Sequence, residues 1–315
     1  MKKPIIILTG PTAVGKTKAS IELAKKIGGE IISADSMQVY KYMDIGSAKI
    51  RSEEMQGVPH YLIDELEPDE EFHVVKFVER AKEHLEEIYA EGKIPIIAGG
   101  TGFYIQALLY DIDFTEQECD EAYRAELELL AAEKGAHYLH NMLREVDPAS
   151  ADAIHANNIK RVIRALEFYH LSGKRISEHN EKEREKTSPY HFAYFVLTDE
   201  RPHLYANIDK RVDLMIEQGL VDEVQKLKNM GFHRDMVSMQ GLGYKEILDY
   251  LDGKTTLEEA IYIIKRETRH FAKRQLTWFR RERDVIWLDK QAYDYQDAKI
   301  LDSMINILKE KTIIN

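Results

Sequence analysis

The chain has 315 residues, enough for one large domain or two smaller ones with a substantial core. Its composition, 44% apolar and 31% charged, is ordinary for a soluble protein, and its net charge of −11 argues against a surface that binds nucleic acid indiscriminately. No apolar run is long enough to span a membrane, and the lone Cys119 excludes a disulfide within the chain, so we expect a cytoplasmic protein with no membrane partner.

Short apolar runs alternate with helical patterns along the first hundred residues, and two further apolar runs occur later in the chain. Helices with a 3.6-residue apolar period are predicted at 17–27 and 73–89. The apolar runs predict strands at 4–10, 30–36, 59–64, 93–100, 191–197 and 284–288. Their nearly continuous apolarity is typical of strands buried on both faces, as in a parallel sheet. The alternation predicts a doubly wound α/β core.

From about residue 113 to 189 the sequence shows no strand signal. Helices are predicted instead, ended by glycine or proline. They cover 118–134, 136–146 and 159–171. We therefore interpret 113–189 as an all-helical insertion domain. The core would consist of a first part, 1–112, and a second, mostly helical part, 190–315.

The loop after the first strand reads GPTAVGKT and matches G-x-x-x-x-G-K-[ST] at every fixed position, which indicates a P-loop NTPase-like core. Glycines let backbone N–H groups turn toward phosphate oxygens, and the positive end of the following helix faces them. Lys16 adds a charge, and Thr17 offers a hydroxyl to Mg²⁺. The predicted diphosphate- or nucleotide-binding residues are Gly10, Pro11, Thr12, Ala13, Val14, Gly15, Lys16 and Thr17. The motif alone does not distinguish ATP from any other ligand that carries a diphosphate.

Two further candidates follow other strands of the predicted sheet. Because the carboxyl ends of parallel strands open onto one crevice, Asp35 should lie just beyond the phosphates and could take a proton from an acceptor. The alternative is a turn or N-cap aspartate. The glycines of AGGTG (98–102) would allow a ligand to approach closely, with Thr101 as a hydrogen-bonding side chain. The alternative there is a tight strand–helix turn.

A basic helical segment occupies 265–283. Arg266, Arg269, Lys273 and Arg280 would share one helix face, which suits a nucleic-acid backbone. The alternative is a solvated face with ion pairs between residues four apart. A second basic segment, in the insertion, contains Lys160, Arg161, Arg164, Lys174 and Arg175. Together the two segments suggest a groove for RNA or DNA.

Seven segments together resemble the bacterial tRNA dimethylallyltransferase family, also called tRNA isopentenyltransferases. They are GPTAVGKT, ISADSMQVYKYMDIGSAK, PHYLID, AGGTGFYIQALL, NNIKRVIRALEFYHLSGK, MQGLGYKE and KRETRHFAKRQLTWFRR. The segments follow the family's order, and the resemblance covers most of the chain, from about residue 4 to 288. The resemblance implies transfer of a dimethylallyl group from dimethylallyl diphosphate to N6 of an adenosine. That adenosine is residue 37, next to the anticodon, in tRNAs that read codons starting with U.

The resemblance also implies roles for individual residues. Asp35 would be the general base, Lys16 and Arg211 would hold the diphosphate, and Thr17 would help to bind Mg²⁺ as the cofactor. The residues expected to contact the anticodon stem-loop are Asp35, Ser36, Met37, Gln38, Thr101, Arg124, Ile159, Lys160, Arg161, Val162, Ile163, Gln240, Gly241, Arg269 and Lys273. We expect a monomer, with any ATP affinity incidental.

Two other classes of function remain open at this point. A P-loop kinase for a small molecule or nucleotide would share the phosphate loop and the acceptor carboxylate, but it leaves the basic helix unexplained. A P-loop RNA-binding or switch protein would hydrolyse nucleotide, or bind RNA in a nucleotide-dependent way, without changing the RNA covalently.

Overall fold

The structure is a computed structural model that describes residues 2–114 and 120–315. It divides the chain into two compact units, Met1–Leu109 with Pro189–Asn315, and Tyr110–Ser188. Cys119 and the start of the helix predicted at 118 lie outside the described residues.

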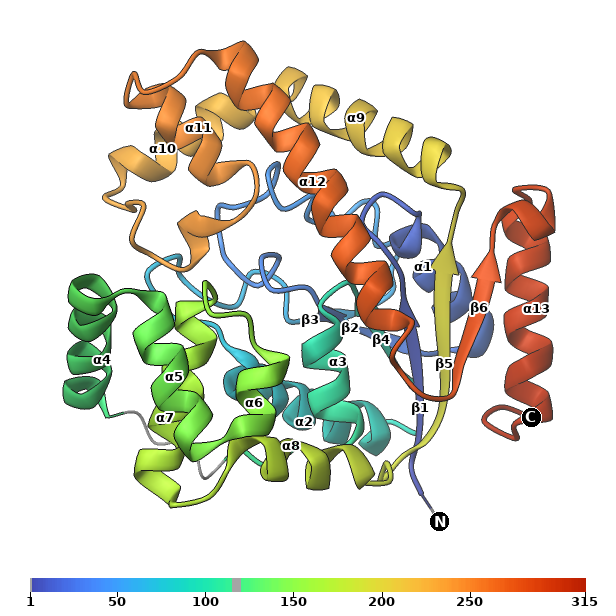
Figure 1. Ribbon diagram of the computed structural model, residues 1–315. Coiled ribbons are helices and arrows are strands. Elements are labelled where there is room, and N and C mark those ends of the chain that lie inside the picture. The colour runs from blue at the N-terminus through green and yellow to red at the C-terminus, as the bar shows by residue number, and fades with distance from the viewer. Residues whose placement is uncertain (1, 115–119) are drawn as a thin grey trace. The chain divides into compact units, whose positions relative to one another are not determined.

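The first unit is built on a six-stranded sheet in which all neighbouring strands are parallel, in the order β3-β2-β4-β1-β5-β6 (Figure 1). The strands are β1 (Pro4–Thr9), β2 (Glu30–Ala34), β3 (His60–Tyr61), β4 (Pro95–Gly99), β5 (His191–Thr198) and β6 (Val285–Asp289). The α/β fold predicted from the sequence is confirmed. β1 lies between β4 and β5, so the loop that follows β1 leaves the middle of the sheet.

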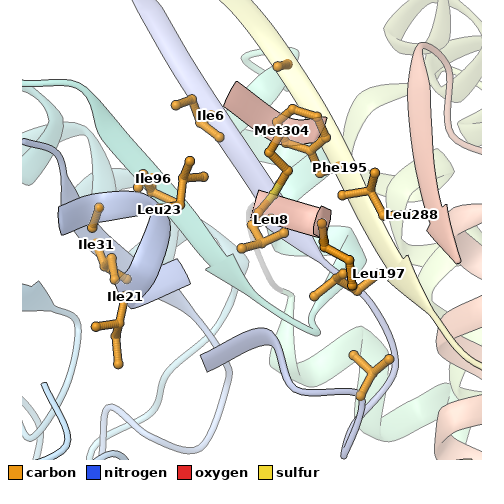
Figure 2. Close-up of a cluster of buried hydrophobic side chains, with 14 of the residues drawn as sticks. Ile6, Leu8, Ile21, Leu23, Ile31, Ile96, Phe195, Leu197, Leu288 and Met304 are labelled. Carbon is orange, nitrogen blue, oxygen red and sulfur yellow. The ribbon is translucent and has the colours of Figure 1, made fainter. Parts of the chain in front are cut away.

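Helices cover this sheet because its strands are apolar on both faces. Ile5 and Ile7 are as completely buried as Ile6 and Leu8, which point to the opposite side. On the Ile6 side, side chains of α1 (Lys16–Ile27) and α13 (Asp297–Glu310) complete a core that includes Leu23 and Met304 (Figure 2). The remaining helices of this unit are α2 (Val74–Ala90), α3 (Gly102–Leu109), α9 (Arg201–Glu217), α10 (Leu220–Asn229), α11 (Tyr244–Leu251) and α12 (Leu257–Phe279), with 3-10 turns η1 (Ser238–Gln240) and η2 (Gln291–Tyr293).

The second unit contains five helices and no strand among its described residues. They are α4 (Glu121–Lys134), α5 (Ala136–Val146), α6 (Pro148–Ala153), α7 (Ile159–Ser172) and α8 (Ile176–Glu185). Leu127, Leu139, Leu143 and Leu166 form its apolar core. The buried Asp147 caps α6 by accepting from the Ser150 N–H at 3.1 Å and also accepts from the Ser177 N–H at 3.0 Å, which ties the start of α8 to α6.

No helix among the described residues is both long and apolar enough to cross a membrane.

Candidate active site

The loop between β1 and α1 is shaped by its two glycines. Gly15 has φ of 99°, in the left-handed region that favours glycine, and Lys16 begins α1 directly after it. A Cβ on Gly10 would overlap the carbonyl oxygen of Leu197, so the loop passes directly against the end of β5. The first N–H groups of α1 have no partner within the helix, as in any α-helix. Because α1 begins directly after Gly15, these groups adjoin the loop, an arrangement that is typical of phosphate-binding sites.

Two cationic side chains converge on this loop. Lys16 Nζ donates to the carbonyl oxygens of Gly10 at 3.0 Å and Pro11 at 2.8 Å. Burial, with a smaller contribution from the Arg211 charge, lowers the pKa of Lys16 to about 7, although Asp35 acts to raise it. Arg211, on α9, donates from Nη1 to Thr12 Oγ1 at 3.0 Å, and burial lowers its pKa while Asp35 again opposes the shift. Lys16, Arg211 and Asp35 thus lie within electrostatic range of one another.

Asp35 follows β2 and adopts the turn that was the alternative to a catalytic role. Its Oδ1 accepts from the N–H of Met37 at 2.8 Å and, more weakly, from that of Gln38 at 3.4 Å. Its Oδ2 has no hydrogen bond within the described part of the chain. One oxygen therefore fixes the turn, and the other is available to a proton on a substrate.

The AGGTG loop lies directly beside the end of β2. The Thr101 N–H donates to the carbonyl oxygen of Ala34, the residue before Asp35, at 3.1 Å. A Cβ on Gly99 would overlap the backbone of Ala34, so glycine is required for this close approach. Asp35 and Thr101 consequently stand next to each other at the carboxyl edge of the sheet.

The two core segments expected to touch RNA also meet. A Cβ on Gly241 would lie 2.5 Å from the methyl carbon of Met37, so the residues after β2 pack against the turn before α11. Gln240 is exposed, and Ser36 is partly exposed. The Gln38 amide instead has internal partners, the Ser33 hydroxyl at 3.3 Å and the Ala48 carbonyl at 3.2 Å.

The basic face of α12 divides into two parts. Arg269 donates to both carboxylate oxygens of Asp209 on α9 at 2.8 Å, and Lys265 pairs with Asp213 at 2.5 Å. These pairs join α12 to α9, so this part of the face is ion-paired, although not through the pairs between residues four apart on one helix that formed the alternative. Lys273 and Arg274, one turn further along, are exposed. Lys273 has no ion pair among the described residues.

In the insertion, three of the residues expected to touch RNA have structural roles. Arg124 Nη2 donates to both oxygens of the fully buried Glu167, at 3.0 and 2.8 Å, and Arg164 adds a bond at 3.1 Å. Val162 and Ile163 are buried in the apolar core of the insertion. We correct the expectation for these two, because buried side chains cannot reach a partner without unpacking that core. Lys160 and Arg161 are exposed, and Ile159 is partly exposed.

A glycine-bounded loop after a central parallel strand, with a lysine and an arginine directed at it, defines a protein with a P-loop-like core. The sequence profile of IPP transferase matches residues 38–282. The chain belongs to the IPP transferase family, and the resemblance drawn from its seven segments is confirmed.

Relatives and solved structures agree with this assignment. The tRNA dimethylallyltransferase of Lachnoclostridium phytofermentans is 64% identical, in an alignment that covers 99% of this chain and 99% of that one. The tRNA dimethylallyltransferase of Acetivibrio thermocellus is 53% identical, in an alignment that covers 95% of this chain and 96% of that one. The structure of tRNA isopentenylpyrophosphate transferase from Bacillus halodurans matches with a TM-score of 0.74 at 46% identity, over 99% of this chain and 98% of that one. A eukaryotic dimethylallyltransferase captured acting on tRNA matches with a TM-score of 0.78 at 32% identity, over 91% of this chain and 74% of that one.

Proposed function

We propose that the protein transfers a dimethylallyl group from dimethylallyl diphosphate to N6 of adenosine 37, next to the anticodon, in tRNAs that read codons starting with U. The observation that carries the proposal is the convergence of Lys16 and Arg211 on the phosphate loop, with Asp35 in the same site, in a chain of the IPP transferase family. The names of the relatives supply the prenyl donor class and the tRNA.

On the donor side, the loop binds the half of the substrate that leaves. The bond between the allylic carbon and the diphosphate oxygen breaks as the N6–carbon bond forms, so negative charge grows on the diphosphate. Lys16, Arg211 and the N–H groups at the start of α1 would stabilise that charge. The exposed Thr17 hydroxyl in the first turn of α1 is the kind of oxygen ligand that Mg²⁺ takes beside phosphate oxygens. Bound there, the ion would neutralise part of the charge on the leaving group.

On the acceptor side, the N6 lone pair is delocalised into the adenine ring and is a poor nucleophile. Positioning against the allylic carbon must therefore supply much of the acceleration. Oδ2 of Asp35 would accept the proton that N6 loses, and Thr101 beside it would hydrogen-bond near the base. The adenine must leave its stack to reach this edge of the sheet, at a cost of about a few kcal/mol.

The direct test mixes the protein with Mg²⁺, dimethylallyl diphosphate and an anticodon stem-loop that carries adenosine at the target position. Mass spectrometry of the RNA should show one added prenyl group, and an RNA with guanosine at that position is the control. A parallel reaction with labelled ATP tests the kinase alternative. Label on an acceptor, without prenyl addition to the RNA, would overturn the proposal.

Diphosphate binding should be coupled to protonation of Lys16. Its pKa is about 7 without ligand, and a bound diphosphate raises that pKa because it favours the charged form. Binding above pH 7 therefore takes up a proton, and the affinity should fall as the pH rises, by up to about tenfold per pH unit. Calorimetry with pyrophosphate, in buffers of different ionisation enthalpy, measures the uptake. The control is Lys16→Arg, which stays charged; equal proton uptake in both proteins would contradict the prediction.

Lys273→Glu should weaken tRNA binding without changing affinity for the prenyl donor. Lys273 is exposed and unpaired among the described residues, so the substitution changes surface charge without breaking an ion pair. The salt dependence of RNA affinity should become shallower by about one phosphate contact. Fluorescence anisotropy with a labelled stem-loop measures both quantities, and Lys309→Glu, at an exposed position of α13, is the matched control. Equal losses in the two variants would point to net charge alone, and a loss of donor affinity would place Lys273 in the active site.

A further inference from the structure

One buried side chain joins the two loops of the active site. Gln275, on α12, is only 6% exposed. Its Oε1 accepts from the Thr12 N–H of the phosphate loop at 2.9 Å, and its Nε2 donates to the carbonyl oxygen of Gly100 at 2.9 Å. A single amide therefore bridges the end of β1 to the end of β4. The Thr12 hydroxyl also accepts a hydrogen bond from Arg211, so the same residue links Gln275 to the arginine that is predicted to hold the diphosphate.

Side chains of α12 leave no room for a Cβ at either residue next to Thr101. A Cβ on Gly100 would overlap the Gln275 amide nitrogen, and a Cβ on Gly102 would overlap the indole ring of Trp278. Gln275 and Trp278 are three residues apart, so they share a helix face. Thr101 is thus held between two contacts with the same helix, while its own N–H is bound to Ala34 beside Asp35.

We propose that Gln275 is a positioning residue that fixes the separation between the phosphate loop, which would hold the donor, and the AGGTG loop, which lies beside Asp35 on the acceptor side. The proposal rests on the function given above, and Gln275 itself acts through Thr12 and Gly100. Reacting atoms must lie about 3 to 3.5 Å apart, and a misplacement of about 1 Å can cost about 100-fold in rate. An apolar side chain could fill the space but would leave the Thr12 N–H and the Gly100 carbonyl without their partner.

The test compares two replacements of similar size. Gln275→Met removes both hydrogen bonds, and we expect kcat to fall about 10- to 100-fold at saturating donor and RNA. In Gln275→Glu, an ionised carboxylate can only accept, whereas a protonated carboxyl group both accepts and donates. The ratio of its kcat to that of the wild type should therefore rise as the pH falls from about 9 to about 6, and the Gln275→Met ratio should stay flat. A purely structural role would not produce this pH profile.

Several results would overturn the proposal. They are a Gln275→Met enzyme with kcat within about twofold of the wild type, and a Gln275→Glu ratio independent of pH. If Gln275→Met does not fold, Gly100→Ala serves instead, because its Cβ displaces the same amide; a folded Gly100→Ala enzyme with wild-type kcat would also overturn it. All rates are measured below each variant's unfolding transition. Absence of prenyl transfer by the wild type would refute the proposed function, whereas a defect confined to the variants bears on Gln275 alone.

Discussion

Asp35→Asn should lower the rate of a single turnover by about 100-fold or more, the scale of general-base catalysis, with tRNA affinity nearly unchanged. Asparagine keeps the oxygen that accepts the Met37 N–H, so the turn after β2 should persist. What it loses is the negative charge and the second carboxylate oxygen, the one with no hydrogen bond within the described residues. Rapid quenching with saturating enzyme and a labelled stem-loop isolates the chemical step.

Asp35→Ala is the matched comparison, because it removes the turn as well as the charge. Loss of activity in both variants, with binding retained, assigns the effect to the carboxylate. A fully active Asp35→Asn with an inactive Asp35→Ala would show that Asp35 serves the turn and that another group takes the proton. The lost charge should also lower the pKa of Lys16 further, since Asp35 acts to raise it. Diphosphate affinity therefore provides an independent check that the substitution reached the site.

The features that the sequence predicts well depend on neighbours along the chain. The apolar runs and the phosphate loop are local patterns, and the parallel sheet, with the loop placed after its first strand, follows from them. The position of Asp35 follows from one further rule, that parallel strands open onto one edge. Asp35 can hold its turn and also take a proton, because Oδ1 accepts from the Met37 N–H and Oδ2 remains for the substrate in the proposed reaction.

Contacts between distant segments could not be predicted in this way. Gln275 lies 263 residues from Thr12, and although it falls on the buried face of α12 with Ala272 and Phe279, no local pattern identifies its two partners. Arg211 lies 199 residues from Thr12 and was found only by resemblance. The burial of Val162 and Ile163 was different, since both fall on the apolar period of their helix with Leu166. That pattern could have excluded them from the list of RNA contacts.

Pairing also changes the meaning of a basic residue. Arg269 lies in a basic segment and Arg124 was expected to contact RNA by resemblance, yet each donates to both oxygens of one carboxylate. Such a pair must be given up or shared before either residue can bind RNA. The exposed Lys273 and Arg161 carry no such cost. Within the insertion, the ion-paired Arg124 can therefore be compared with the exposed Arg161.

Arg124→Gln should loosen the insertion, whereas Arg161→Gln should weaken RNA binding without doing so. Glu167 is fully buried, and losing Arg124 removes two of the hydrogen bonds to its carboxylate while the bond from Arg164 remains, at a cost of about 1 to 3 kcal/mol in local stability. Arg161 is exposed and has no ion pair among the described residues, so its loss should cost about one phosphate contact in the salt dependence of binding.

Hydrogen exchange of the backbone amides of α4 and α7 separates the two roles, because it reports local stability in the intact chain. Faster exchange in Arg124→Gln alone, with reduced RNA affinity in Arg161→Gln, would place Arg124 in the framework of the insertion. Unchanged exchange in Arg124→Gln, with RNA affinity reduced as much as in Arg161→Gln, would mean that the ion pair is not needed to hold the helices together. Arg124 would then be free to exchange Glu167 for a phosphate, and the original expectation of an RNA contact would stand.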